Sequence, residues 1–108
     1  MQKLLIKPLS VNEAWQGKRF KTVKYKKYIN NVCLILKPLK VNDEKLKVNL
    51  SFGFSSPLAD IDNPIKMILD ILQLKYKFND KNIFELNVKK EIVKKGLEFI
   101  EIEILSLN

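Results

Sequence analysis

The stretch KLKVNLSFGF, residues 45–54, alternates apolar and polar side chains at every second position. Successive side chains of a β-strand point to opposite faces, so the leucines, the valine and the phenylalanines fall together on one face. The pattern therefore predicts a strand that is buried on one face and more open on the other. The segments on either side of this strand then decide how the sheet is built.

A helix is predicted to start at Pro64, because proline is favoured at the first position of a helix. Asp62 or Asn63 is the expected cap at its N-terminus. Apolar residues follow at spacings of three and four, which places them on one face of the helix: Ile65, Ile68, Leu69 and Leu72.

Two further strands are predicted towards the C-terminus. Apolar and polar residues alternate over 84–88 and again over 97–105, and the Lys-Lys-Gly sequence at 94–96 is typical of a hairpin turn between them. The alternation slips at Phe99 and Ile100. The slip indicates either a β-bulge or two neighbouring residues that are both buried.

On the N-terminal side, residues 2–6 predict a short strand, and 7–20 predict a loop with several turn-forming residues. Residues 22–37 predict a helix that ends before Pro38. One face of that helix carries Tyr25, Ile29, Val32 and Leu36.

These elements together predict an α/β fold of the α+β kind, with a mixed, mainly antiparallel sheet and two helices. The 108 residues match the usual size of one domain. We therefore expect residues 1–108 to form a single small domain.

The net charge of +8 is concentrated in the N-terminal part of the chain. Residues 1–40 carry ten lysines and arginines against one acid, whereas residues 41–108 carry ten lysines against eleven acids. A local basic excess of this kind favours a nucleic-acid partner, because neutralised phosphates release condensed counterions. The alternative is a charged surface that only keeps the protein in solution.

The composition also excludes several classes of protein. The sequence has no histidine, which excludes serine–histidine catalysis and histidine-ligated zinc. The only cysteine, Cys33, cannot form an internal disulfide and is expected in the core. Neither a membrane-spanning run nor a signal peptide is recognisable, so we expect a cytoplasmic protein that is not bound to a membrane.

An acidic motif precedes the predicted second helix. Asp60 and Asp62 are two residues apart, so in extended chain their carboxylates point to the same side. Asp80 lies in a later loop, and Lys66 lies in the first turn of the helix. Oxygen ligands without nitrogen or sulfur favour Mg²⁺, for which Mn²⁺ can substitute. In isolation, Asp60 to Asn63 ahead of a proline are most often a turn with a helix cap, and Asp80 is a common turn residue.

The acids belong to a longer pattern, which resembles the signature of the RusA family of Holliday junction resolvases. It consists of Asp60-x-Asp62-Asn63-x-x-Lys66, Leu69-Asp70-x-Leu72 and Asn79-Asp80-x-x-Ile83, preceded by Asn12, Trp15, the stretch 17–22 and Tyr28. The order and spacing of these residues extend over essentially the whole chain.

The resemblance implies that Asp60, Asp62 and Asp80 bind the metal and that Lys66 is the catalytic lysine. It also implies a homodimer whose paired active sites cut opposed strands of a four-way DNA junction. One residue departs from the family pattern: Asn79 stands where an acid is common, so it is assigned a secondary role.

Several neighbouring residues have two interpretations. Asp70 is one helical turn after Lys66, where it either positions the lysine or is merely exposed. Trp15 either stacks on unpaired bases or covers the core. The candidate DNA contacts are Asn12, Trp15, Lys18, Arg19, Lys21, Lys24 and Lys27.

With this resemblance, the sequence predicts a cytoplasmic, magnesium-dependent endonuclease, and the resemblance implies a bacterial or phage origin and a role in DNA recombination and repair. Two alternatives stay open: a DNA-binding protein without catalysis, and a nuclease that prefers flaps or forks to four-way junctions.

Overall fold

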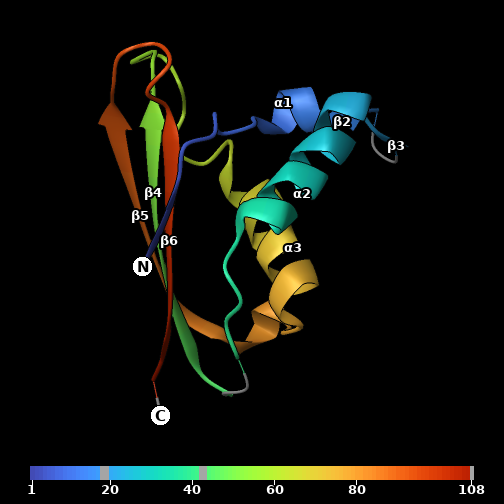
Figure 1. The fold of residues 1–108 in the computed structure, drawn as a ribbon, viewed down its shortest axis with the longest axis vertical. Helices are drawn as coiled ribbons and strands as arrows, with labels where there is room; N and C mark the ends of the chain where they lie inside the picture. The colour runs from blue at the N-terminus through green and yellow to red at the C-terminus, as the bar shows by residue number, and fades with distance from the viewer. Residues whose placement is uncertain (18–19, 42–43, 108) are drawn as a thin grey trace.

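The computed structural model describes residues 1–17, 20–41 and 44–107. Its main sheet has four strands in the order β1-β6-β4-β5, and a second sheet pairs two very short strands, β2 and β3 (Figure 1). The strands are β1 (Gln2–Leu4), β2 (Trp15–Gln16), β3 (Phe20–Lys21), β4 (Leu46–Phe54), β5 (Ile83–Ile92) and β6 (Phe99–Ser106). The helices are α1 (Val11–Ala14), α2 (Val23–Ile35), α3 (Ile65–Tyr76) and the 3₁₀-helix η1 (Asp80–Asn82).

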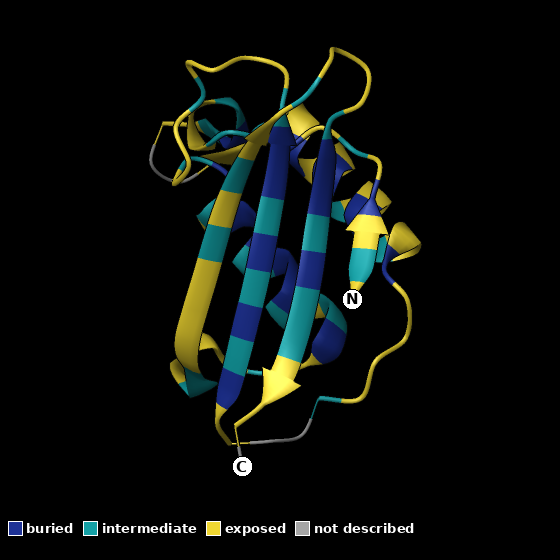
Figure 2. Ribbon diagram, turned by 90° about the vertical axis from the view of Figure 1, so that its left-hand side faces the viewer, coloured by how far each residue is buried: buried dark blue, intermediate teal, exposed yellow. Residues whose placement is uncertain are grey.

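Strand β4 forms the centre of the sheet, as its alternation predicts. Leu46, Val48, Leu50 and Phe52 are no more than 1% exposed, while the residues between them are half-buried. Strand β6 is antiparallel to β4 on one side, and β5 is parallel to β4 on the other. Figure 2 shows β5 as the mostly exposed edge of the sheet.

Helices α2 and α3 lie on one face of the sheet, and their apolar residues close the core against β4 and β6 (Figure 1). The α2 helix starts where the sequence predicts, because the side chain of Thr22 accepts a hydrogen bond from the backbone N–H of Tyr25 at 3.1 Å. The α3 helix ends at Lys77, whose φ of 58° is left-handed. In the described part of the chain, no helix is long and apolar enough to span a membrane.

The predicted loop at 7–20 contains more structure than expected. It includes the four-residue helix α1 and the β2–β3 pair, so the described residues form three α-helices where two were predicted. Thr22 anchors this region, since its backbone N–H donates to the carbonyl of Ala14 at 2.9 Å and its hydroxyl donates to the carbonyl of Glu13 at 2.7 Å. A helix of four residues is too short to produce a readable hydrophobic period, which explains why the sequence pattern missed it.

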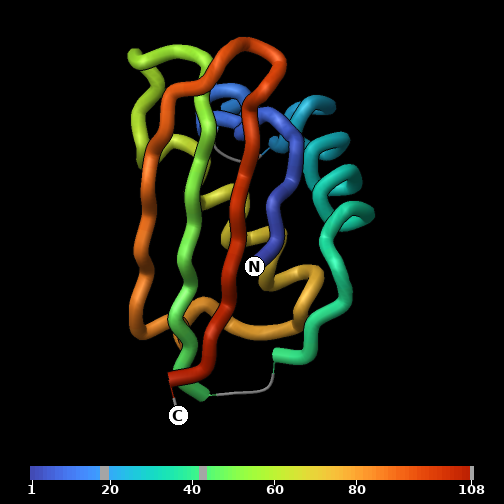
Figure 3. The backbone as a smooth tube through the Cα atoms, turned by 60° about the vertical axis from the view of Figure 1, so that its left-hand side comes forward, coloured from blue at the N-terminus to red at the C-terminus, as the bar shows by residue number. Residues whose placement is uncertain are grey.

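The predicted hairpin at 94–96 is wrong. Strands β5 and β6 both pair with β4, so their connection passes over the end of β4 instead of turning back on itself (Figure 3). A β-bulge at residues 99–100 is also absent, because Phe99 pairs in register with Gly53 and Ile100 pairs with Phe52. Both residues are buried: a Cβ on Gly53 would lie 2.3 Å from the ring of Phe99, so this ring covers the glycine directly.

Candidate functional site

Asp60 and Asp62 lie in the loop that connects β4 to α3, and both are exposed. Consecutive turns shape this loop: the N–H of Asn63 donates to the carbonyl of Asp60, and the N–H of Ile65 donates to that of Asp62, each at 3.3 Å. Pro64 occupies the capping position of α3 without a side-chain cap. The prediction that Asp62 or Asn63 caps the helix is therefore wrong.

Because neither residue caps α3, the carboxylates of Asp60 and Asp62 are uncommitted, meaning that no side chain in the described residues pairs with them. Within the described ranges, neither carboxylate accepts a hydrogen bond or forms an ion pair with a side chain. A helix cap was the alternative to metal binding as an interpretation of this motif. The geometry excludes a capping role for Asp62.

Lys66 is in the first turn of α3, and its ammonium group forms an ion pair with Asp70 at 3.1 Å. The side chain of Lys66 is 66% exposed, so this contact between residues one helical turn apart contributes little stability. The predicted pairing of Asp70 with Lys66 is confirmed. An exposed ammonium held in this way can exchange a carboxylate for a phosphate oxygen at small cost.

Asp80 lies at the opposite end of α3 from Asp60 and Asp62. It begins η1, and its backbone N–H donates to the side chain of Gln73 at 3.0 Å. The twelve residues of α3 alone span about 18 Å at the usual helical rise. No three acidic or cysteine residues in the described segments form a group that could hold a metal ion.

The expected convergence of the three carboxylates thus does not occur within one chain. Convergence of Asp80 with Asp60 and Asp62 required the strand after Asp80 to begin beside the start of α3. Strand β5 is instead parallel to β4, with Ile83 opposite Leu46, so Asp80 lies near the start of β4 while Asp60 follows its end. The side chain of Asn79 accepts from the N–H of Lys81 at 3.0 Å, which makes it a cap for η1.

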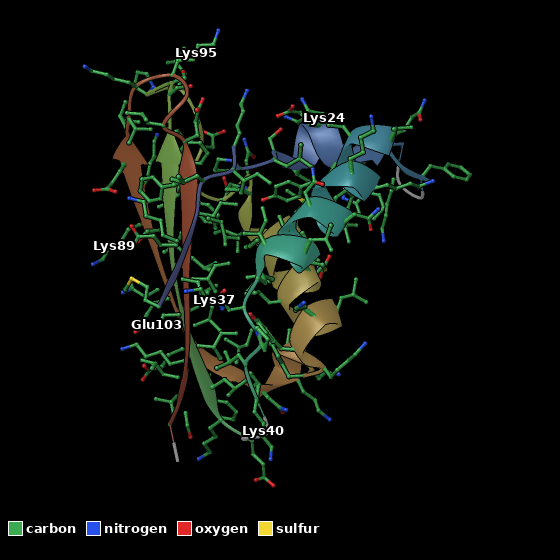
Figure 4. All side chains as sticks on the ribbon, viewed as in Figure 1. Lys24, Lys37, Lys40, Lys89, Lys95 and Glu103 are labelled. Atoms are coloured by element: carbon green, nitrogen blue, oxygen red, sulfur yellow. The ribbon has the colours of Figure 1, made fainter. Side chains whose placement is uncertain are left out.

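A pocket of about 210 Å³ opens beside Asp60. Its wall includes Glu13, Asn63 and Glu98, and helix α1 is joined to the loop where the N–H of Val11 donates to the carbonyl of Asn63 at 3.1 Å. Sequence reasoning missed Glu13. Lys24, labelled in Figure 4, reaches from α2 to form an ion pair with its carboxylate.

The Glu13–Lys24 pair predicts a small, pH-dependent stabilisation. The hydrogen bond from Lys24 lowers the pKa of Glu13 below its usual value of 4.5 despite partial burial. Because the pKa of Glu13 is lower in the folded state, the ion pair stabilises the fold fully above the usual pKa of 4.5. This stabilisation is lost as the pH falls through the lower pKa of the folded state. We expect Glu13→Gln to reduce the free energy of unfolding by about 0.5 kcal/mol at pH 7, and the reduction to shrink steadily as the pH falls below 4.5. A series of urea denaturations from pH 7 downwards checks this, and a loss that does not change with pH would contradict it.

The N-terminal candidates divide into two groups. Trp15 is half-buried and packs edge-on against the ring of Tyr25 at 5.6 Å, which favours a core-covering role. Burial, and then the charge of Asp70, raise the pKa of Tyr25 to about 12. The exposed candidates are Asn12, Lys21, Lys24 and Lys27, whereas Lys18 and Arg19 lie outside the described residues.

Lys90 is a second residue that sequence reasoning missed. Its ammonium group donates to the carbonyl of Pro57 at 3.1 Å and to that of Ala59, the residue directly before Asp60. One weak signal for it was present in the sequence: the alternation of β5 places this lysine among apolar residues, on the face that meets the helices.

Comparison with known proteins identifies the family. No curated protein gives a significant match to the sequence. The family model described as endodeoxyribonuclease RusA matches residues 9–104, which includes every described site residue named above. The chain therefore belongs to the RusA family of endodeoxyribonucleases.

Proposed function

We propose that the protein is a magnesium-dependent endonuclease that resolves four-way DNA junctions in recombination and repair by paired hydrolysis of phosphodiesters. The family match supports a nuclease of this kind. The observation that carries the proposal is the pair of exposed, uncommitted carboxylates on the short loop before α3.

The donor set of this loop fits a hard divalent cation. Asp60 and Asp62 offer only oxygen atoms, and two carboxylates leave most positions around Mg²⁺ to water and to phosphate oxygens, as this ion prefers. A bound Mg²⁺ lowers the pKa of coordinated water and offsets charge at the phosphate, a chemistry that needs no histidine.

The remaining residues of the site bind and orient DNA. Lys66 exchanges its ion pair with Asp70 for a contact with the scissile phosphate. In the absence of DNA, the ion pair with Asp70 keeps the Lys66 side chain on the correct side of α3. Lys21, which lines a pocket with Asp70, and Lys27 on α2 are both exposed. They grip the junction arms through phosphates, which reads shape more than sequence.

We further propose that the third carboxylate, Asp80, acts from a second copy in a homodimer. Strand β5 is an exposed edge whose start adjoins Asp80 and whose Lys90 contacts the loop before Asp60. A two-fold axis through the middle of this edge brings the Asp80 end of one copy to the Asp60 end of the other. The exposed apolar side chains along β5 support burial there: Phe84, Leu86 and Ile92 are 61%, 44% and 51% exposed.

The direct test is cleavage of a synthetic four-way junction with Mg²⁺, with Mn²⁺ and with EDTA. We expect symmetric paired nicks with either metal, none with EDTA, and none in linear duplex of the same sequence. Faster cutting of flaps or forks would reassign the substrate. Tight junction binding without cleavage in either metal would contradict the proposal and identify a DNA-binding protein without catalysis.

A further inference from the structure

Lys90 lies on the face of the edge strand β5 that is turned towards the helices, where the neighbouring side chains are apolar and a lysine is unusual. The parallel register sets it opposite Phe52, which is fully buried, so its side chain leaves the sheet on the face that meets the helices. The residue is half-buried, unlike its neighbour Lys89, which is exposed and points away from the helices in Figure 4.

Both acceptors that the ammonium group of Lys90 contacts are backbone carbonyls of the acidic loop. The ammonium group donates to the carbonyl of Pro57 at 3.1 Å and to that of Ala59, and no carboxylate in the described ranges pairs with it. Residues 55–58 of this loop are exposed. The loop is held at its two ends, where the side chain of Ser55 hydrogen-bonds Glu98 and the carbonyl of Asn63 accepts from the N–H of Val11. Between these ends the contacts from Lys90 attach the backbone at Pro57 and Ala59 to strand β5.

We propose that Lys90 is a positioning residue for the metal site: it fixes the backbone just before Asp60 and thereby holds the Asp60 and Asp62 carboxylates where one cation can be bound. The inference rests on the proposed function, because it assigns a role towards the metal of that site. Charged hydrogen bonds to carbonyls are the strong kind, and groups that orient metal ligands are typically worth about tenfold or more in affinity.

The direction in which replacement of Lys90 changes the metal affinity distinguishes a positioning role from simple electrostatic repulsion. Lys90 is a cation close to a cation site, so removal of its charge alone would strengthen metal binding by relieving repulsion. Loss of the attachment would weaken binding, because the carboxylates would have to be ordered when the ion binds. A neutral variant with weaker metal binding can therefore be explained only by lost positioning.

The experiment measures Mn²⁺ binding to the full-length protein by electron paramagnetic resonance, alongside the Mg²⁺ concentration that gives half-maximal junction cleavage. We expect Lys90→Met to weaken Mn²⁺ binding about tenfold and to raise the half-maximal Mg²⁺ concentration similarly. Lys90→Arg, which retains charge and donors, should restore most of the affinity, and Lys75→Met, in the last turn of α3 and outside β5, should match wild type. If Lys90→Met fails to fold by circular dichroism, Lys90→Gln serves as the neutral variant.

The outcomes separate the two proposals. Unchanged or tighter Mn²⁺ binding by the folded neutral variant, with normal binding by wild type, would overturn the positioning role and leave the nuclease intact. Absence of both metal binding and cleavage in wild type would overturn the proposed function and this inference with it.

Discussion

Asp62→Asn is expected to lower the rate of junction cleavage on the order of a thousandfold while junction binding is kept. Each tenfold in rate corresponds to about 1.4 kcal/mol, and a carboxylate that holds the metal at the phosphate contributes several kcal/mol to the transition state. Asparagine has nearly the same shape but no charge. Because the carboxylate of Asp62 neither caps α3 nor forms an ion pair within the described residues, its loss should leave stability unchanged.

The measurement is single-turnover cleavage of a labelled junction at saturating protein, with binding followed by gel shift in EDTA. Binding should be equal or slightly tighter, because the variant removes a negative charge that repels phosphates. Glu44→Gln is the matched control, since it makes the same exchange of acid for amide at an exposed position outside β5. Cleavage by Asp62→Asn within tenfold of wild type would contradict a metal-binding role for this residue.

The sequence predicts those parts of the fold whose signals are local. The alternation at residues 45–54 gives β4, and the spacing of Ile68 and Leu72 gives the buried face of α3. Strand pairing is not a local property. A Lys-Lys-Gly turn between two alternating segments reads as a hairpin, but β4 is already placed between β5 and β6, and burial of β4 on both sides outweighs the turn signal.

The same distinction between local signals and long-range contacts applies to the candidate site. The Lys66–Asp70 pair follows from spacing along the chain and occurs as predicted. The acidic loop lies where predicted, before α3, but it consists of consecutive turns in place of the expected extended segment with an Asp62 or Asn63 cap. The place of Asp80 depends on whether β5 runs parallel or antiparallel to β4, which no residue pattern fixes. Lys90 and Glu13 depend on contacts between residues 31 and 11 positions apart, so only the folded chain identifies them.

The separation of Asp80 from Asp60 and Asp62 leads to the second large effect, which mixed dimers should show. Asp62→Asn and Asp80→Asn homodimers are each expected to be inactive. In a hybrid of the two, a site built from both subunits combines the intact loop of one chain with the intact Asp80 of the other. Such a hybrid has one complete site, whereas sites built within single chains would leave none.

Each purified hybrid dimer has one complete site of two, so about half of the wild-type sites should return. The expected product is a single nick in place of paired nicks, measured after the two differently tagged variants are co-expressed and the hybrid is purified through both tags. A hybrid of Asp60→Asn with Asp62→Asn is the matched control, because both of its loops are altered and neither arrangement can rescue it. If the Asp62→Asn/Asp80→Asn hybrid is as inactive as this control, Asp80 does not complete the site of the other chain. The carboxylates of Asp60 and Asp62 would then have to hold the metal without it, since the length of α3 keeps Asp80 out of reach within one chain.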